Sequence, residues 1–168
     1  MAIRIVRFGT PRAADEGPRL GTVRRPPRGV RKEDWSRRDY FDVWVPDLAP
    51  SAPLVSWALA EPWTEERWTR YARLYRKEMR EPAAQRLIGL LATLSHHTNL
   101  AVGCYCEDAN HCHRSLLRDL LFTAGADLVP DDPGGTADEP ATPGDSTRGS
   151  RTSRRASKAA RPPQPRAR

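Results

Sequence analysis

The sequence is short of lysine and of long apolar runs. Lys32, Lys77 and Lys158 are the only lysines among 28 basic residues, so arginine carries nearly all of the positive charge. No apolar run approaches the roughly 18 residues that a membrane-spanning helix needs. The N-terminal segment MAIRIVRF has charges spaced among its apolar residues, which argues against a signal peptide. These absences predict a cytoplasmic protein with no membrane partner.

Cysteine is also scarce, and its placement is uneven. Cys104, Cys106 and Cys112 are the three cysteines of the chain, and they lie within nine positions of one another. A small secreted domain held by disulfides has an even number of cysteines spread along its length. The odd, clustered set therefore argues against a disulfide framework.

The net charge of +7 hides a strong asymmetry along the chain. Residues 1–38 have a balance of +7, residues 39–146 a balance of −8, and residues 147–168 a balance of +8. The pI of about 9.9 thus describes two basic ends around an acidic middle. It does not indicate that the folded part is a basic nucleic-acid binder.

The composition changes after Val129. Residues 130–168 contain seven prolines and no aromatic residue, so this stretch cannot bury enough surface to offset its ordering entropy. We predict an α/β domain over residues 1–129 and a disordered, Pro/Arg-rich basic tail over residues 130–168. The tail is either an inert solubilising extension or a nonspecific nucleic-acid tether that acts through counterion release.

Apolar patterns predict the elements of the domain. Strands are expected at residues 3–8, 20–23, 41–45 and 100–106, and helices at residues 64–81, from Pro82 onward and at residues 115–124. Residues 48–56 are expected to be irregular because prolines interrupt them. The continuous apolar run at 100–106 suits a strand buried on both faces, as in a parallel sheet. The expected fold is a small α/β domain with a mostly parallel sheet flanked by helices.

The segment that joins the strand at 100–106 to the helix at 115–124 is the most informative part of the sequence. Ligands of open α/β sheets bind at the carboxyl ends of strands, and a helix start offers free N–H groups to anions. On one interpretation Cys104 and Cys106 are core residues, and His113 and Arg114 brace the loop. On a second, the loop is an anion site for a phosphate or nucleotide, with Arg114 as its clamp.

Two further interpretations concern reactivity. Cys112 is a candidate nucleophile, with His113 or His111 as its base and Glu107 as a second proton handler. The segment also offers zinc-type ligands, and the candidate set is Cys106, His111, Cys112 and His113. Their spacing lacks the paired C-x-x-C knuckles of common structural zinc sites. The residues alone leave these alternatives open.

The same segment resembles the DUF488 family. CYCEDANHCHRSLL is similar to the C-x-E-x4-C-H-R signature of that family, which Cys106, Glu107, Cys112, His113 and Arg114 match position by position.

The N-terminal part resembles the YeaO-like branch of the same family. RRPPRG at 24–29, followed by Lys32, is similar to its R-x-x-P-R-G segment, and VWVPDLAPS at 43–51 and the helix at 68–80 also have counterparts there. The resemblance covers about residues 1–128 and implies a compact α/β fold with a site at the signature residues. It carries no established activity, so any cofactor is unknown.

Two arginine-bearing loops are expected to converge on one pocket, which Arg24, Arg28 and Arg114 line. The planar fork of arginine suits a phosphate or carboxylate. The sequence therefore predicts a pocket for a small anionic ligand, phosphate or nucleotide-like. The alternatives are a cysteine-dependent enzyme acting on nucleotide or nucleic acid, and a metal-binding or redox-responsive accessory protein.

Overall fold

The computed structural model describes residues 1–130 of the chain. The tail predicted from residue 130 onward lies outside the described residues, apart from Pro130, and so does the predicted nucleic-acid tether. The boundary between residues 129 and 130 stays a prediction.

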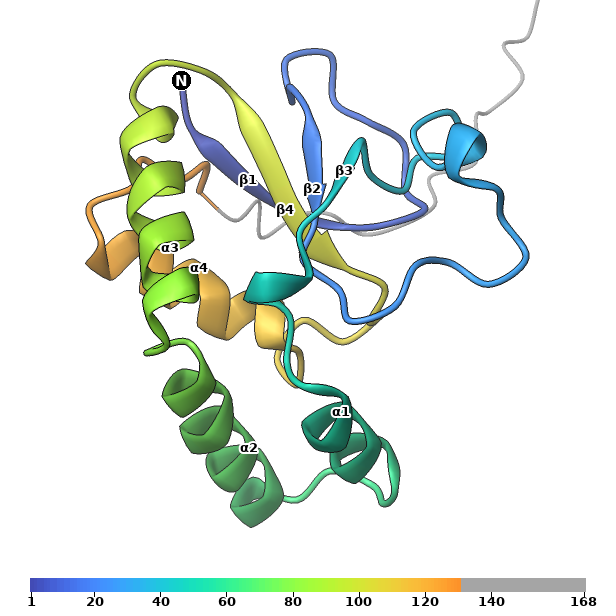
Figure 1. Ribbon diagram of the computed structural model, residues 1–168, viewed down its shortest axis with the longest axis vertical. Helices are drawn as coiled ribbons and strands as arrows, with labels where there is room; N and C mark the ends of the chain where they lie inside the picture. The colour runs from blue at the N-terminus through green and yellow to red at the C-terminus, as the bar shows by residue number, and fades with distance from the viewer. Residues whose placement is uncertain (131–168) are drawn as a thin grey trace, which may run out of the picture. The chain divides into compact units, whose positions relative to one another are not determined.

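A four-stranded sheet forms the centre of the fold (Figure 1). Every pairing between its strands is parallel, and their order across the sheet is β1-β4-β2-β3. The strands are β1 (Ile3–Arg7), β2 (Arg19–Gly21), β3 (Val43–Trp44) and β4 (Leu100–Cys104). Together with the helices, this sheet confirms the predicted α/β class.

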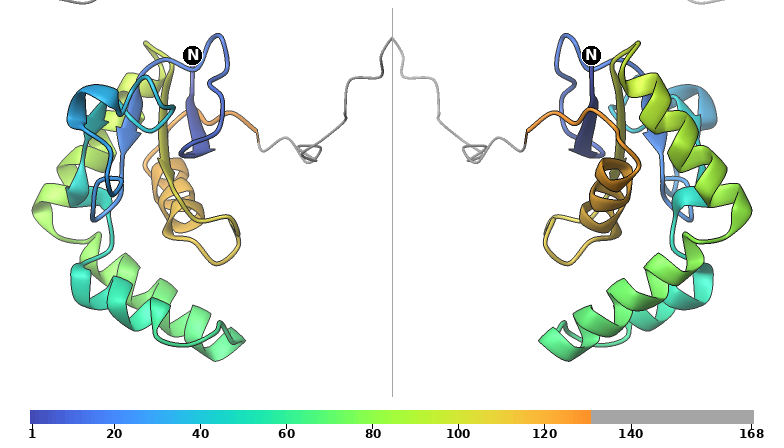
Figure 2. Two further views of the ribbon diagram at one scale, coloured as in Figure 1. Left: turned by 90° about the vertical axis from the view of Figure 1, so that its right-hand side faces the viewer. Right: turned by 90° about the vertical axis from the view of Figure 1, so that its left-hand side faces the viewer.

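Four α-helices within residues 1–130 accompany the sheet. They are α1 (Ala52–Leu59), α2 (Glu65–Glu78), α3 (Pro82–Ser95) and α4 (His113–Thr123), and 3-10 turns occur at Lys32–Asp34 and Pro46–Leu48. Helices α1 and α2 lie beyond the ends of the strands to which the arrows point, as the three views show (Figures 1 and 2). No helix among residues 1–130 is long and apolar enough to cross a membrane.

Local sequence explains how the two longest helices begin. The Thr64 side chain accepts a hydrogen bond from the Arg67 N–H at 3.2 Å and caps α2, as its position before two glutamates predicted. Pro82 opens α3, where its missing N–H costs no helical hydrogen bond. Both helix starts confirm the sequence prediction.

The prediction of an irregular segment at 48–56 is wrong in its second half. Helix α1 begins at Ala52, with Ser51 as its N-cap and Pro53 in its first turn. The Ser51 hydroxyl donates to Glu78 at 2.5 Å, and its N–H donates to the same carboxylate at 2.9 Å. The prolines that suggested irregular structure instead suit a helix start, because the first turn needs no N–H donor.

Other element bounds also differ from the sequence prediction. Only Val43 and Trp44 of the strand expected at 41–45 form a strand, since their partner β2 is three residues long. Strand β4 ends at Cys104 rather than at residue 106. Helix α4 begins two residues before the expected Ser115, which places His113 and Arg114 in its first turn.

The larger core cluster lies between the sheet and the helices. Leu100 and Val102 of β4 pack there with Tyr75 of α2, Ile88 of α3 and Leu117 of α4. The apolar stripes that predicted these helices therefore supply this core.

A second cluster combines Val6 of β1 and Ala101 and Cys104 of β4 with side chains from the loops rather than from α2 or α3. It is rich in aromatic rings, and Phe41 lies 5.4 Å from Phe8 and 4.9 Å from Trp35 between ring centroids. Gly21 faces this cluster, and a Cβ there would lie 2.6 Å from the Phe41 ring. The aromatic packing thus requires glycine at the end of β2.

A buried ion pair fastens the N-terminal loops. Arg19 is fully buried and Glu16 is 3 % exposed. Arg19 Nε donates to the Glu16 carboxylate, and Nη2 donates to its second oxygen at 3.1 Å. The guanidinium also donates to the carbonyls of Thr10 at 2.9 Å, Pro11 at 3.2 Å and Asp39 at 2.5 Å. One side chain therefore ties together two loops that lie apart in the sequence.

Candidate functional site

The two loops singled out by the sequence leave the same edge of the sheet. Strands β2 and β4 are parallel neighbours, with Leu20 opposite Val102. The arginine loop, residues 24–28, follows β2, and the cysteine-bearing segment follows β4. Parallel strands present their carboxyl ends on one side, so loops about 80 residues apart in the chain come together.

A cleft of about 590 Å³ lies between these loops and the helices α1 and α2. The arginine loop contributes Arg24, Arg25 and Arg28 to its lining. Aromatic side chains also line it: Tyr40, Trp63, Tyr71 and Tyr105. No aspartate or glutamate is among the described residues that line this cleft, although 17 of the chain's acidic residues lie in residues 39–146.

Three thiols, here called the thiol cluster, form another part of the lining. Cys104 ends β4, Cys106 follows it in the loop, and Cys112 is the N-cap of α4. Their sulfur atoms all lie within 4.8 Å of one another, and the Cys104 and Cys106 sulfurs are 3.5 Å apart. The cluster forms because a strand end and a helix start meet at this edge of the sheet.

The three thiols differ in exposure and in acidity. Cys112 is 1 % and Cys104 is 6 % exposed, whereas Cys106 is exposed. Hydrogen bonds from the Cys104 and Cys112 thiols lower the pKa of Cys106. The same hydrogen bonding raises the pKa of Cys112, and Cys104 has its pKa raised to about 11 by its bond to Cys106. Cys106, which one of the sequence interpretations placed in the core, is thus the accessible thiol of the three.

His113 lies beside Cys112 in a fixed orientation. Its Nε2 is 2.7 Å from the Thr22 carbonyl oxygen, and its Nδ1 is 3.9 Å from Cys112 Sγ. Since a carbonyl only accepts, we assign the proton to Nε2, which leaves the Nδ1 lone pair toward the thiol. Burial lowers the pKa of His113, which favours the neutral form of the ring.

Arg114 and Glu107 belong to the same segment but are absent from the cleft lining. Arg114 is 7 % exposed, and its guanidinium donates to the carbonyls of Cys106 at 2.6 Å and Glu107 at 3.3 Å. Glu107 is exposed and forms an ion pair with Arg7 at 2.8 Å. The roles of anion clamp for Arg114 and proton handler for Glu107 stay predictions.

His111 lines the cleft without joining the thiol cluster. Its Nδ1 lies 2.5 Å from an Asp108 carboxylate oxygen, and its ring stacks on Trp63 with an interplanar angle of 14°. Of the metal-ligand set predicted from the sequence, the structure brings Cys106 and Cys112 together and adds Cys104. The two-residue spacing of Cys104 and Cys106 in the sequence was the feature that could have predicted Cys104 as the third sulfur ligand.

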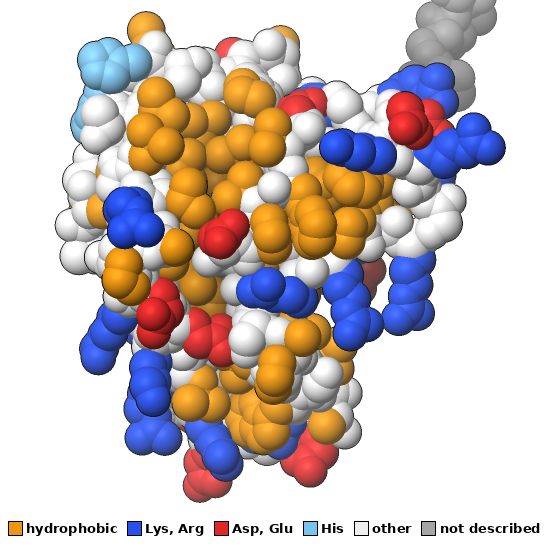
Figure 3. Space-filling model, viewed as in Figure 1, with side chains coloured by type: hydrophobic (Ala, Val, Ile, Leu, Met, Phe, Trp, Pro, Cys, Tyr) orange, Lys and Arg blue, Asp and Glu red, His pale blue; other side chains and the backbone are white. Residues whose placement is uncertain are grey.

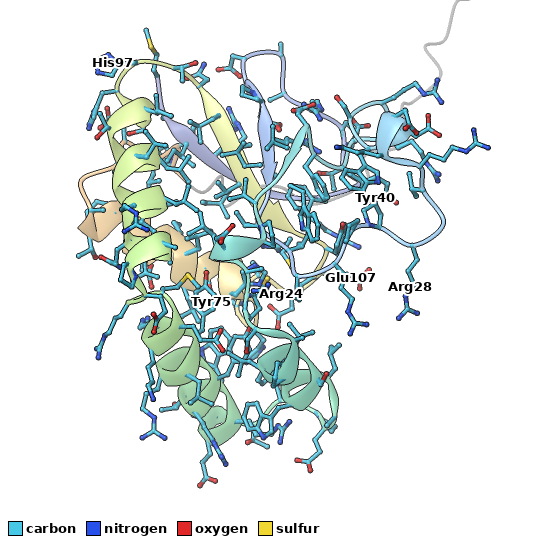
Figure 4. The ribbon with its side chains drawn as sticks, in the orientation of Figure 1. Arg24, Arg28, Tyr40, Tyr75, His97 and Glu107 are labelled. Carbon is cyan, nitrogen blue, oxygen red and sulfur yellow. The ribbon has the colours of Figure 1, made fainter. Side chains whose placement is uncertain are left out.

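The arginines of the loop after β2 differ in how they are held. Arg24 donates to the carbonyls of Pro50 at 2.8 Å and Ala49 at 3.0 Å, so its charge is fixed at the cleft without a carboxylate partner among residues 1–130. Arg25 and Arg28 are exposed. Figure 4 shows Arg28 extending from its loop into open space, on the side of the molecule opposite His97.

Arg24, Arg25 and Arg28 therefore bring positive charge to the cleft, whose described lining has no acidic side chain. In Figure 3, Lys and Arg side chains gather over the lower half and the right-hand side of the face shown, beside apolar surface. Arg25 lines the cleft but was not among the ligand-binding residues predicted from the sequence. Its position between Arg24 and Arg28 in the same loop could have predicted its place in the lining.

Comparisons of the chain with known proteins agree with the family resemblance that its signature residues predicted. A family model described as the active DUF488-N3 subclade matches residues 3–125. The chain belongs to the DUF488 family. Similar proteins include uncharacterised proteins of Mycobacterium bovis and Mycobacterium tuberculosis, each 30 % identical over 122 residues, which cover 71 % of this chain and 92 % of the relative. No solved structure matches this DUF488 chain. The YeaO-like assignment of its N-terminal part stays a prediction.

Exposure predicts which thiol of this DUF488 protein reacts first. In the reduced, metal-free native protein, iodoacetamide should modify Cys106 alone, because Cys104 and Cys112 are buried. After unfolding, all three cysteines should react. Peptide mass spectrometry of the two samples checks this, and modification of Cys112 at the rate of Cys106 in the native protein would contradict it.

Proposed function

We propose that the cleft binds a small anionic ligand that also carries a planar ring, as a nucleotide does. One observation carries the proposal: three arginines and four aromatic side chains line a single cleft that has no acidic residue among its described lining. A pocket with apolar walls and a few convergent polar groups is the usual form of a small-molecule site. The excess positive charge selects an anion.

Arg24, Arg25 and Arg28 are the ligand-binding residues in this proposal. The carbonyl contacts of Arg24 hold its guanidinium in place, and no carboxylate of the described part of the chain neutralises its charge. Arg25 and Arg28 are exposed, so they are free to form forked, charge-assisted hydrogen bonds with phosphate oxygens. The two exposed arginines therefore supply affinity, and the fixed Arg24 supplies orientation.

The aromatic wall accommodates the ring of the ligand. Tyr105 is held by edge-on contacts with Phe8, at 5.7 Å, and Tyr40, at 5.9 Å between centroids. Trp63 also lines the cleft and is fixed against Tyr71, at 5.4 Å between centroids. Rigid aromatic faces of this kind bind nucleobases with little sequence preference.

Arg114 has a positioning role in the same proposal. Its hydrogen bonds to two consecutive carbonyls fix the loop that carries Cys106. The thiol cluster is thereby held at the cleft beside the expected place of the ligand.

Binding measurements on variants of the full chain test the proposal. We expect nucleoside monophosphates to bind the wild-type protein in isothermal titration calorimetry. The double variant Arg25→Ala/Arg28→Ala should bind at least tenfold more weakly, which corresponds to about 1.4 kcal/mol. Inorganic phosphate should bind more weakly than the nucleotide, because it lacks a ring.

The matched control is Arg80→Ala/Arg86→Ala, which removes two exposed arginines from outside the cleft lining. Its affinity should stay within twofold of wild type. Equal weakening in both double variants would show that only net charge matters. No binding of any nucleoside monophosphate to the wild type would overturn the proposal.

A second candidate is a cysteine-dependent enzyme that acts on the same ligand. It is favoured by one observation, the exposed Cys106 thiol in the lining of the cleft. In that case Cys106→Ser should abolish turnover of the bound nucleotide and preserve its binding. Turnover that survives in Cys106→Ser would exclude this candidate.

A further inference from the structure

We propose that Cys104, Cys106 and Cys112 form a Zn²⁺ site in which three thiolates hold the ion and the fourth position opens into the cleft. The inference goes beyond ligand binding by the arginine loop and does not rest on it. It also changes the ligand set expected from the sequence, because Cys104 replaces both histidines.

The distances between the sulfur atoms suit such an ion. A Zn–S bond of about 2.3 Å places two thiolates of one tetrahedral site roughly 3.8 Å apart. The three sulfurs of the cluster all lie within 4.8 Å of one another, and those of Cys104 and Cys106 are 3.5 Å apart. Small side-chain rotations therefore bring all three to bonding distance.

Each ligand is carried by backbone that is fixed from outside the cluster. The Cys104 carbonyl accepts from the Phe8 N–H at 2.9 Å, which pairs the end of β4 with β1. The Cys106 carbonyl accepts from Arg114 at 2.6 Å, and the Cys112 carbonyl accepts from the Ser115 hydroxyl at 2.9 Å. A site on anchored backbone loses little freedom when it binds an ion.

The surroundings favour thiolates over thiols once an ion is bound. Cys112 is the N-cap of the eleven-residue helix α4, whose N-terminus carries a partial positive charge. The buried guanidinium of Arg114 donates a hydrogen bond to the carbonyl of Cys106 itself. Three thiolates and Zn²⁺ together have a charge of −1, which these positive groups offset.

The histidines have other partners. His111 is bound to Asp108 and stacked on Trp63, outside the group of sulfurs. His113 faces Cys112 with Nδ1 and is fixed by Thr22 through Nε2. All three cysteines line the cleft, so a water molecule or a ligand group can reach the remaining position of the ion. Zinc sites with an open position are those that take part in reactions.

Titration of the reduced full-length chain with Co²⁺, a spectroscopic probe for Zn²⁺, tests the proposal. We expect one equivalent to bind with a thiolate-to-metal charge-transfer band, and Zn²⁺ to displace it. Cys104→Ser, Cys106→Ser and Cys112→Ser should each weaken binding at least tenfold. The control His111→Ala should bind within twofold of wild type. Added imidazole should change the Co²⁺ spectrum by occupying the open position.

A second measurement needs no variant and so does not depend on their folding. One equivalent of Zn²⁺ should slow modification of Cys106 by iodoacetamide in the wild-type protein at least tenfold. Absence of a charge-transfer band, or unchanged modification of Cys106 at saturating Zn²⁺, would overturn the site. A loss in His111→Ala as large as in the cysteine variants would overturn the ligand set. Arg25→Ala/Arg28→Ala should retain Zn²⁺ binding, which separates this test from that of the anionic ligand.

Discussion

Replacement of Arg19 by methionine should lower the free energy of unfolding by about 3–5 kcal/mol, the usual effect of removing one partner of a buried ion pair. The variant leaves the Glu16 carboxylate in a site where it is 3 % exposed, without its guanidinium partner. It also removes the donors to the carbonyls of Thr10, Pro11 and Asp39. Urea denaturation followed by circular dichroism measures the loss.

The pH dependence of this loss identifies its cause. Burial by itself raises the pKa of Glu16, but hydrogen bonds from Arg19 and the Ala13 N–H, with the charges of Arg19 and Arg12, bring it below 4.5. A carboxyl group with a lowered pKa stabilises the wild type above pH 4.5 and loses that contribution as the pH falls through its folded-state pKa. Without Arg19 the buried carboxylate is instead a penalty, which protonation relieves. The difference in the free energy of unfolding between wild type and Arg19→Met should therefore shrink as the pH falls from neutral to about 4, where the carboxyl group becomes protonated.

The control for this experiment is Arg37→Met. Arg37 forms an ion pair with Asp34 at 2.5 Å, but its side chain is 79 % exposed. An exposed pair contributes about 0–1 kcal/mol, so this variant should be close to wild type. Equal destabilisation of the two variants, or a loss in Arg19→Met that grows toward low pH, would contradict the account.

The burial of Arg19 could not be predicted from the sequence. In the sequence this arginine is one of 28 basic residues and stands at the start of a short strand. Nothing in its neighbourhood marks it as fully buried, because its partners are one nearby carboxylate and carbonyls of separate loops. The elements that were predicted well have local causes, such as the Thr64 cap, the proline that opens α3 and the apolar run of β4.

Helix α1 was missed for a related reason. Its start depends on Ser51, which Glu78 of the following helix holds in place. The prolines are visible in the sequence, but the contact between Ser51 and Glu78 that stabilises the helix start is a tertiary contact, which the sequence does not reveal.

The candidate site was predictable in its loops and less so in its side chains. The arginine loop and the cysteine-bearing segment were expected to meet, and the parallel pairing of β2 with β4 explains why they share an edge of the sheet. Which arginine lines the cleft depends on side-chain direction. Arg28 lines it, whereas Arg114, in the first turn of α4, faces the carbonyls of its own loop. Trp63 reaches the cleft from the connection between α1 and α2, and no sequence pattern linked it to the cysteines.

The Arg114→Ala variant distinguishes a positioning role from the ligand clamp predicted from the sequence. Hydrogen bonds that involve a charged group contribute about 1.5–3 kcal/mol, and we expect a loss in the free energy of unfolding of this size. The freed loop should also expose the other thiols, so that iodoacetamide modifies Cys104 and Cys112 in the native, metal-free protein. Nucleotide and Zn²⁺ binding should both weaken, because the loop borders the cleft and carries Cys106.

Arg114→Lys provides the matched comparison. Lysine keeps the positive charge but lacks the planar fork that reaches the carbonyls of Cys106 and Glu107 together. If Arg114 positions the loop, the lysine variant should resemble the alanine variant in stability and in thiol exposure. If Arg114 instead binds the ligand as a clamp, Arg114→Ala should keep the stability and thiol exposure of the wild type but lose nucleotide affinity. Arg114→Lys should then retain that affinity. The thiol pattern decides between them, because a ligand clamp has no reason to keep Cys104 and Cys112 buried in the unliganded protein.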